Sequence, residues 1–156
     1  MFLNGRNIIV VNDYSEEKIS DFTEISPKRF LPKNNLILWT ILNGFKMFPA
    51  EDVIVIAFSD FELTDKMLTV AGFAYSGEKH TDLGVISLDG DKEYGNLLYA
   101  EVNGISLNAF ALTRNLANGI EKDLTDELIF GDDIPDERLT AMLKRTERRL
   151  LRLSRL

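Results

Sequence analysis

The chain has 156 residues, of which 45% are hydrophobic and 28% charged, and its formal net charge is −7. This length and composition predict one folded domain with a hydrophobic core and exclude a chain that is disordered throughout. The absence of cysteine excludes a disulfide framework, a thiolate metal site and a cysteine nucleophile. The sequence also lacks a glycine-rich phosphate loop, and we expect no cofactor.

The sequence gives no sign of a membrane span or a secretory signal. No apolar run approaches the length of about 18 residues that a spanning helix requires. The N-terminal residues lack a basic segment followed by a long apolar one. We therefore expect a cytoplasmic protein, found in the host cytoplasm or the virion if it is viral.

The first half of the chain alternates between strand and helix signals. Residues Asn7–Val11 predict a strand, and the amphipathic segment Tyr14–Phe22 predicts a helix. Apolar side chains at helical spacing over 36–45 predict a second helix, which ends before Pro49. The unbroken apolar run Val53–Phe58 predicts a central strand that is covered on both faces.

The second half is predicted to contain a three-stranded antiparallel meander followed by helices. The three strands are expected at Thr69–Tyr75, Val85–Leu88 and Leu97–Val102. Ser106 is then expected to cap a helix that includes residues 109–120. A last helix is expected to begin at Pro135 and to run to the end of the chain. The predicted fold is a single α+β domain with a mixed, largely antiparallel sheet, packed helices and an amphipathic C-terminal helix.

Charge is distributed very unevenly along the chain. Residues 1–137 carry 11 basic and 24 acidic side chains, for a net charge of −13, whereas residues 138–156 carry 7 and 1, for a net charge of +6. We therefore divide the chain into an acidic α+β body, residues 1–134, and a basic amphipathic helix, residues 135–156, that packs on the body or extends from it.

The basic segment suggests a binding surface. Its polar face would dock on a protein partner or on the acidic body of another copy, or alternatively on a nucleic-acid backbone. The candidate partner-binding residues are Lys144, Arg145, Arg148, Arg149, Arg152 and Arg155.

Two carboxylate clusters offer an enzymatic alternative. Asp60, Glu62 and Thr64 directly follow the apolar run Val53–Phe58, and the run LIFGDDIPD contains Asp132 and Asp136. These clusters resemble the D-x-D-x-T and G-D-x-x-x-D motifs of haloacid-dehalogenase-like phosphotransferases, with glutamate at the second acidic position of the first motif. The resemblance implies a phosphatase in which Asp60 is the nucleophile and Asp60 and Asp132 hold Mg²⁺.

The sequence favours a non-enzymatic role in interaction or assembly over this catalytic alternative. The basic C-terminal helix would mediate self-association or docking on a larger protein, as in a viral structural component or an inhibitor of a host protein. A nucleic-acid-associated regulator and the Mg²⁺-dependent phosphatase are the two alternatives. No metal site is expected under the favoured interpretation.

Overall fold

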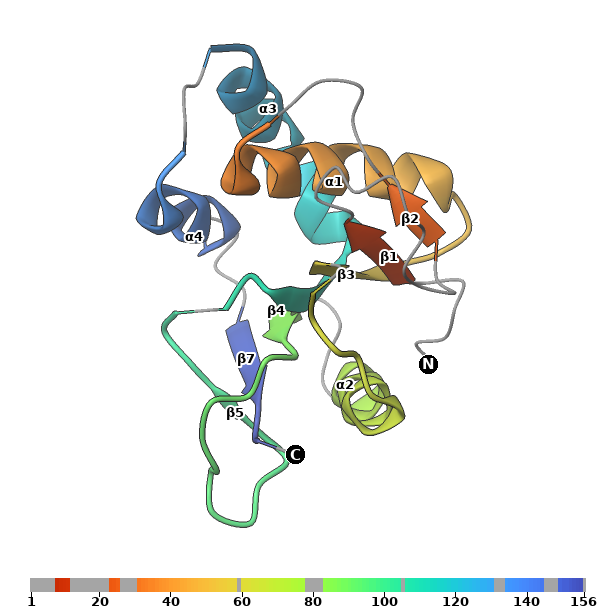
Figure 1. The fold of residues 1–156 in the computed structure, drawn as a ribbon, viewed down its shortest axis with the longest axis vertical. Helices are drawn as coiled ribbons and strands as arrows, with labels where there is room; N and C mark the ends of the chain where they lie inside the picture. The colour runs from red at the N-terminus through yellow and green to blue at the C-terminus, as the bar shows by residue number, and fades with distance from the viewer. Residues whose placement is uncertain are drawn as a thin grey trace.

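The fold is a mixed sheet with helices on both faces (Figure 1). The structure is a computed structural model, and it describes residues 8–11, 23–25, 31–58, 60–77, 83–104, 106–130, 134–144 and 149–155. In chain order its elements are β1 (Ile8–Val11), β2 (Thr23–Ile25), α1 (Lys33–Met47), β3 (Val53–Phe58), α2 (Asp65–Gly77), β4 (Leu83–Ser87), β5 (Tyr99–Glu101), β6 (Ala109–Thr113), α3 (Arg114–Phe130), α4 (Asp136–Lys144) and β7 (Arg149–Leu153).

The seven strands lie in the order β2-β1-β3-β6-β4-β7-β5. The pairs β1–β2, β1–β3 and β4–β7 are parallel, whereas β3–β6, β4–β6 and β5–β7 are antiparallel. Since β4 and β3 are both antiparallel to β6, the strands β1, β2, β3, β4 and β7 all run in one direction. The prediction of a single mixed α+β domain is confirmed, but the sheet is not largely antiparallel in the part of the chain that the structure describes.

Strand β3 lies between β1 and β6, and all six of its side chains are buried. This confirms the central strand that the run Val53–Phe58 predicts. Helix α1 ends at Met47, before Pro49, and β1 coincides with the first predicted strand. The helix predicted over Tyr14–Phe22 lies outside the described residues.

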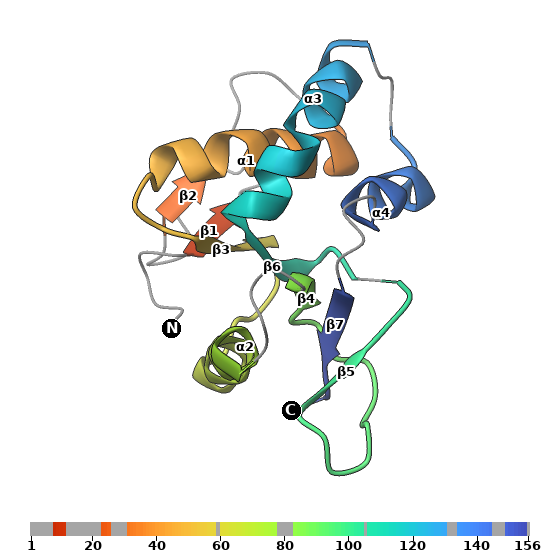
Figure 2. The same cartoon turned by 180° about the vertical axis from the view of Figure 1, so that it is seen from behind.

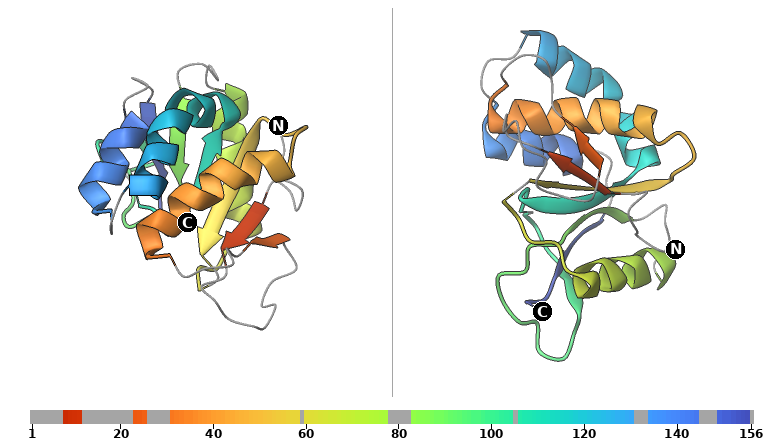
Figure 3. Two further views of the ribbon diagram at one scale, coloured as in Figure 1. Left: turned by 90° about the horizontal axis from the view of Figure 1, so that it is seen from above. Right: turned by 45° about the vertical axis from the view of Figure 1, so that its right-hand side comes forward.

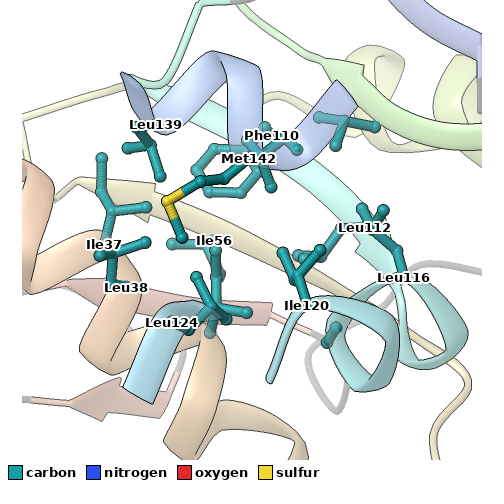
Figure 4. Close-up of a cluster of buried hydrophobic side chains, with 14 of the residues drawn as sticks. Ile37, Leu38, Ile56, Phe110, Leu112, Leu116, Ile120, Leu124, Leu139 and Met142 are labelled. Atoms are coloured by element: carbon teal, nitrogen blue, oxygen red, sulfur yellow. The ribbon is translucent and has the colours of Figure 1, made fainter. Parts of the chain in front are cut away.

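The two faces of the sheet carry separate cores because successive strand residues point in opposite directions. Ile54 and Ile56 of β3 face the larger core, beneath helices α1, α3 and α4. Val53 and Val55 face the second core, which α2 covers. Figure 3 shows α2 alone on one side of the sheet and the other helices on the opposite side, and Figure 4 shows residues from α1, α3 and α4 meeting those of the sheet in the larger core.

The predicted antiparallel meander is wrong. Residues 69–75 belong to helix α2, and β4 and β5 are not neighbours because β7 lies between them. Leu68, Ala71 and Tyr75 are buried at helical spacing, while Phe73 is exposed, which is the pattern of a helix with one face on a sheet. Burial raises the pKa of the Tyr75 hydroxyl far above its usual range.

Residues 109–113 also differ from the prediction, since they form strand β6 and not the start of a helix. All five side chains are buried, and β6 pairs with β3 on one side and β4 on the other. The helix begins directly after this strand, where the Thr113 hydroxyl accepts a hydrogen bond from the backbone N–H of Leu116. The sequence therefore predicts this helix in the right region but starts it several residues too early.

The basic C-terminal segment is not one helix. Helix α4 ends at Lys144, and residues Arg149–Leu153 form strand β7 inside the sheet (Figure 2). Leu150 contributes to the larger core and Leu151 to the second core, as alternation along a strand requires. The leucine spacing that fits a helix also fits this strand, and pairing with β4 and β5 selects the strand. A continuous basic helical face over residues 135–156 is therefore absent.

Candidate functional site

Polar side chains gather at the edge of the sheet where its parallel strands end. We call this the carboxyl edge: it comprises the residues that follow β3 and β4, the start of β6, and the N-termini of α1 and α4. The chain passes from β1 outward to β2 and returns through α1 to β3, on the other side of β1. The carboxyl ends of β1 and β3 are thus a topological switch point, the place where open α/β sheets bind ligands.

Asp60 and Glu62 lie at this switch point, just after β3. Both side chains are exposed, in a turn where the backbone N–H of Phe61 donates to the carbonyl of Phe58 at 3.0 Å. The turn ends at Thr64, whose hydroxyl accepts a bond from the N–H of Met67 and so caps α2. The buried strand and the capped helix hold these two carboxylates at the rim of the edge.

A second polar cluster joins the end of β4 to the start of β6. One carboxylate oxygen of Asp89, Oδ2, accepts hydrogen bonds of 2.9 Å from both the Ser106 hydroxyl and the Asn108 amide. The Ser87 hydroxyl in turn donates to the carbonyl of Ser106 and accepts from its backbone N–H, both at 3.1 Å. These bonds fix Asp89 and Asn108 beside each other.

Lys33, the first residue of α1, reaches across the same edge. Its ammonium donates to Asn108 Oδ1 at 3.1 Å and lies 5.1 Å from the centre of the Phe58 ring. The side chain is exposed, so that an ammonium with three donors keeps capacity for a ligand. Lys33 therefore connects the end of β3 with the Asp89 cluster.

Asp136, another of the predicted site residues, is the first residue of α4 and also lies at this edge. Its Oδ1 accepts a 2.6 Å bond from the amide of Asn34, which also donates to the carbonyl of Ile134 at 2.7 Å. Asn35 accepts a bond from the N–H of Ile134, so that two buried amides of α1 secure the start of α4. Asp132 lies outside the described residues, and its separation from Asp60, on which the phosphatase interpretation depends, is not tested.

A hollow of about 240 Å³ opens between α1, α4 and the segment before β6. Its wall is polar, and it includes Lys33 and Asn108 on one side and Asp136 and Thr140 on the other. In the described part of the chain, no group of three or more histidine, aspartate or glutamate side chains could hold a metal ion by itself. The described residues of the edge thus offer hydrogen-bonding groups and separate carboxylates, without an all-protein metal cage.

The structure describes four of the six basic residues that are predicted to bind a partner, and these four differ in their surroundings. The guanidinium of Arg152 donates to the carbonyl of Asp89 at 2.7 Å and pairs with Asp91 at 3.4 Å. Arg149 is half-buried within β7, while Lys144 and Arg155 are exposed. The remaining two candidates, Arg145 and Arg148, lie outside the described residues. Arg152 therefore supports the loop that carries Asp89, and partner binding by these residues stays a prediction.

The sequence did not reveal Lys33, Asp89 and Asn108 as members of one site. Lys33 and Asn108 are separated by 75 positions, and no motif joins them. The detectable signal was the position of Asp89 just after the apolar run Val85–Leu88, as Asp60 stands after Val53–Phe58.

Comparison with known proteins gives structural neighbours only. No family model and no curated protein matches the sequence. The crystal structure of A197 from STIV matches 94% of this chain and 81% of its own chain, with a TM-score of 0.56 and 15% identity. A glycosyltransferase involved in the glycosylation of the major capsid of PBCV-1 matches with the same two coverages, a TM-score of 0.59 and 11% identity. These likenesses establish the fold.

Among the described residues, no helix is both long and apolar enough to cross a membrane.

Proposed function

We propose that the protein is a glycosyltransferase that uses a nucleoside diphosphate sugar as donor. The observation that carries the proposal is the exposed pair Asp60 and Glu62 at the β1–β3 switch point, in a fold similar to that of a glycosyltransferase. The two neighbours also support a viral setting, since one is A197 from STIV and the other is involved in the glycosylation of a major capsid.

The carboxylate pair suits a divalent cation that is bound together with substrate phosphates. Mg²⁺ is commonly held by one or two carboxylates plus phosphate oxygens and waters, and not by a dedicated protein cage. Among the described residues, Asp60 and Glu62 supply two such carboxylates without a third group. Asp60 and Glu62 would hold such a cation, which would supply positive charge to stabilise the leaving diphosphate.

The reaction balances without a redox partner. The acceptor hydroxyl oxygen forms a bond to the anomeric carbon of the donor sugar, and the bond from that carbon to the phosphate oxygen breaks. The nucleoside diphosphate leaves with the bonding electron pair, and the hydroxyl proton passes to a base or to water. The carboxyl edge provides the donor site for this step.

The test is calorimetric titration of the full chain with nucleoside diphosphate sugars of uridine, guanosine and cytidine, with and without Mg²⁺ or Mn²⁺. Asp60→Asn should weaken metal-dependent binding by about tenfold or more, since a charged ligand contact contributes about 1.5–3 kcal/mol. Asp52→Asn is the matched control, because Asp52 is also exposed but lies at the opposite end of β3. Absence of binding for the whole panel, or equal losses in both variants, would contradict the proposal.

A second candidate is self-association, which retains the assembly role that the sequence favours. It is supported by Leu97 and Leu98, which are 62% and 51% exposed and directly precede β5, the last strand in the sheet order. An exposed apolar segment beside an edge strand is a common site of strand pairing between copies. Light scattering should show that the unaltered protein is a dimer. The double variant Leu97→Ser/Leu98→Ser should be a monomer, whereas the control Phe73→Ser, on α2, should still be a dimer.

A further inference from the structure

The hollow between α1, α4 and residues 106–108 has the chemistry of a site for a neutral, hydroxyl-rich ligand. Lys33, Asn108 and Thr140 bring donors to its wall, and Asp136 brings a carboxylate acceptor. A sugar hydroxyl both donates and accepts hydrogen bonds, so that it can pair with groups of both kinds. We propose that this hollow binds one sugar ring of the acceptor, an inference that rests on the proposed glycosyltransferase function.

The wall is held in place before any ligand binds. Asn34, only 7% exposed, donates to Asp136 Oδ1 at 2.6 Å and thereby orients the carboxylate. Within the described residues Oδ2 of Asp136 keeps its accepting capacity. On the other side Asn108 is fixed by Asp89 at 2.9 Å and accepts from Lys33 at 3.1 Å. A pre-oriented wall of this kind lowers the entropic cost of binding.

Charge excludes the main competing ligand, an inorganic or organic phosphate. Lys33 would attract a phosphate, but the carboxylate of Asp136 lines the same hollow and would repel it. The two charges together leave the wall close to neutral. A neutral polyol meets both groups without an uncompensated charge.

Size restricts the occupant further. Sites for drug-sized ligands measure about 300–1,000 Å³, whereas this hollow measures about 240 Å³. A single sugar ring suits that volume better than a nucleoside diphosphate sugar does. The hollow also lies beside the donor site, because Lys33, on its wall, contacts the ring of Phe58, two residues before Asp60.

The experiment uses the full chain without nucleotide and a panel of methyl glycosides of glucose, galactose, mannose and xylose. Saturation-transfer NMR detects binding, and ¹H–¹⁵N shift changes locate it. At least one glycoside should bind and shift the signals of residues 106–108 and 136–140. Thr140→Val and Asp136→Asn should each weaken it by about threefold to tenfold, the effect of one lost hydrogen bond.

The controls separate a local effect from a loss of folding. Asp136→Asn keeps the oxygen that Asn34 uses, and a thermal melt of each variant checks that it is folded. Thr69→Val is the matched control, since Thr69 is exposed on α2, on the other face of the sheet. The inference fails if no glycoside binds, if both hollow variants bind as tightly as the unaltered chain, or if pyrophosphate displaces the glycoside.

The donor titration distinguishes this failure from failure of the proposed function. Nucleotide-sugar binding that depends on Asp60, without any glycoside binding, would leave the glycosyltransferase proposal standing and reject the acceptor site. Glycoside binding that depends on Thr140, without any nucleotide binding, would support a sugar site in the hollow and reject the glycosyltransferase.

Discussion

Strand β3 has a cation near each end, Arg114 at its start and Lys33 at its finish. Arg114 donates to the carbonyl of Glu51 at 2.8 and 3.1 Å, to that of Phe48 at 2.6 Å and to that of Phe45 at 3.4 Å. Its guanidinium also lies 4.9 Å from the centre of the Phe45 ring. Arg114 therefore stabilises the end of α1 and the segment that connects it to β3.

Lys33 makes far fewer contacts at the other end. It has one hydrogen bond, to the exposed Asn108, and one ring contact, to Phe58, in the described residues. A guanidinium fork that is used fully on backbone carbonyls stabilises the fold, whereas an exposed ammonium with unused donors can serve a ligand. The contacts of Arg114 therefore indicate a structural role at one edge, whereas Lys33 keeps free donors at the carboxyl edge, where we propose that ligands bind.

Arg114→Met should give the largest loss of stability. The substitution removes four hydrogen bonds from a charged group and the contact with the Phe45 ring, while keeping the aliphatic bulk. Because the side chain is only partly buried, water can replace some of these bonds, and we expect a loss of about 2–3 kcal/mol. Urea unfolding measures it. A loss below about 0.5 kcal/mol, the usual range for a surface change, would contradict the structural role of Arg114.

The folded fraction of Arg114→Met should bind nucleotide sugars as the unaltered chain does. A specific loss of nucleotide affinity in this variant would place ligand binding at the wrong end of β3.

Local sequence patterns predicted those elements whose own run of side chains is enough to distinguish a helix from a strand. The run Val53–Phe58 and the helical spacing of α1 are long enough to be unambiguous, and Asp136 and Glu137 mark the first turn of α4. Asp60 and Glu62 could be singled out because they follow such a run.

The remaining elements depend on partners from distant parts of the chain. Residues 109–113 are a short, mostly apolar run and residues 149–153 are three leucines with two arginines, and each segment fits either a helix or a strand by itself. Pairing with β3 and β4 decides the first, and pairing with β4 and β5 decides the second. The hollow could not be predicted from the sequence either, because its wall joins residues such as Asn34 and Asp136, which are 102 positions apart.

Gly90→Ala should give the next largest loss of stability. It tests whether the end of β7 supports the loop that carries Asp89 at the carboxyl edge. A Cβ atom on Gly90 would lie 2.6 Å from the carbonyl oxygen of Ser154 and 2.7 Å from that of Leu153. Both contacts are with backbone at the end of β7, which cannot move aside without disturbing the sheet. We expect a loss of about 2 kcal/mol in urea unfolding, as in other overpacked sites.

Gly44→Ala is the matched control for that variant. Its Cβ would meet only the side-chain ends of Ile9 at 2.8 Å and Ile54 at 3.0 Å, which can shift. Replacement of glycine by alanine within a helix gains about 1 kcal/mol, which offsets that strain. Equal losses in the two variants would show that the end of β7 does not brace the loop of Asp89.

Compared with Arg114→Met and Gly90→Ala, Lys33→Met should change stability least and ligand binding most. An exposed cation–π contact contributes about 0.5–1 kcal/mol, and Asn108, being exposed, can exchange the ammonium for water. We therefore expect a loss of stability of less than about 1 kcal/mol, together with a glycoside affinity lowered about threefold to tenfold. Urea unfolding and saturation-transfer NMR on the same samples measure both. If stability falls as far as in Arg114→Met while glycoside binding is retained, then Lys33 is a second structural lock and the contrast between the two edges is wrong.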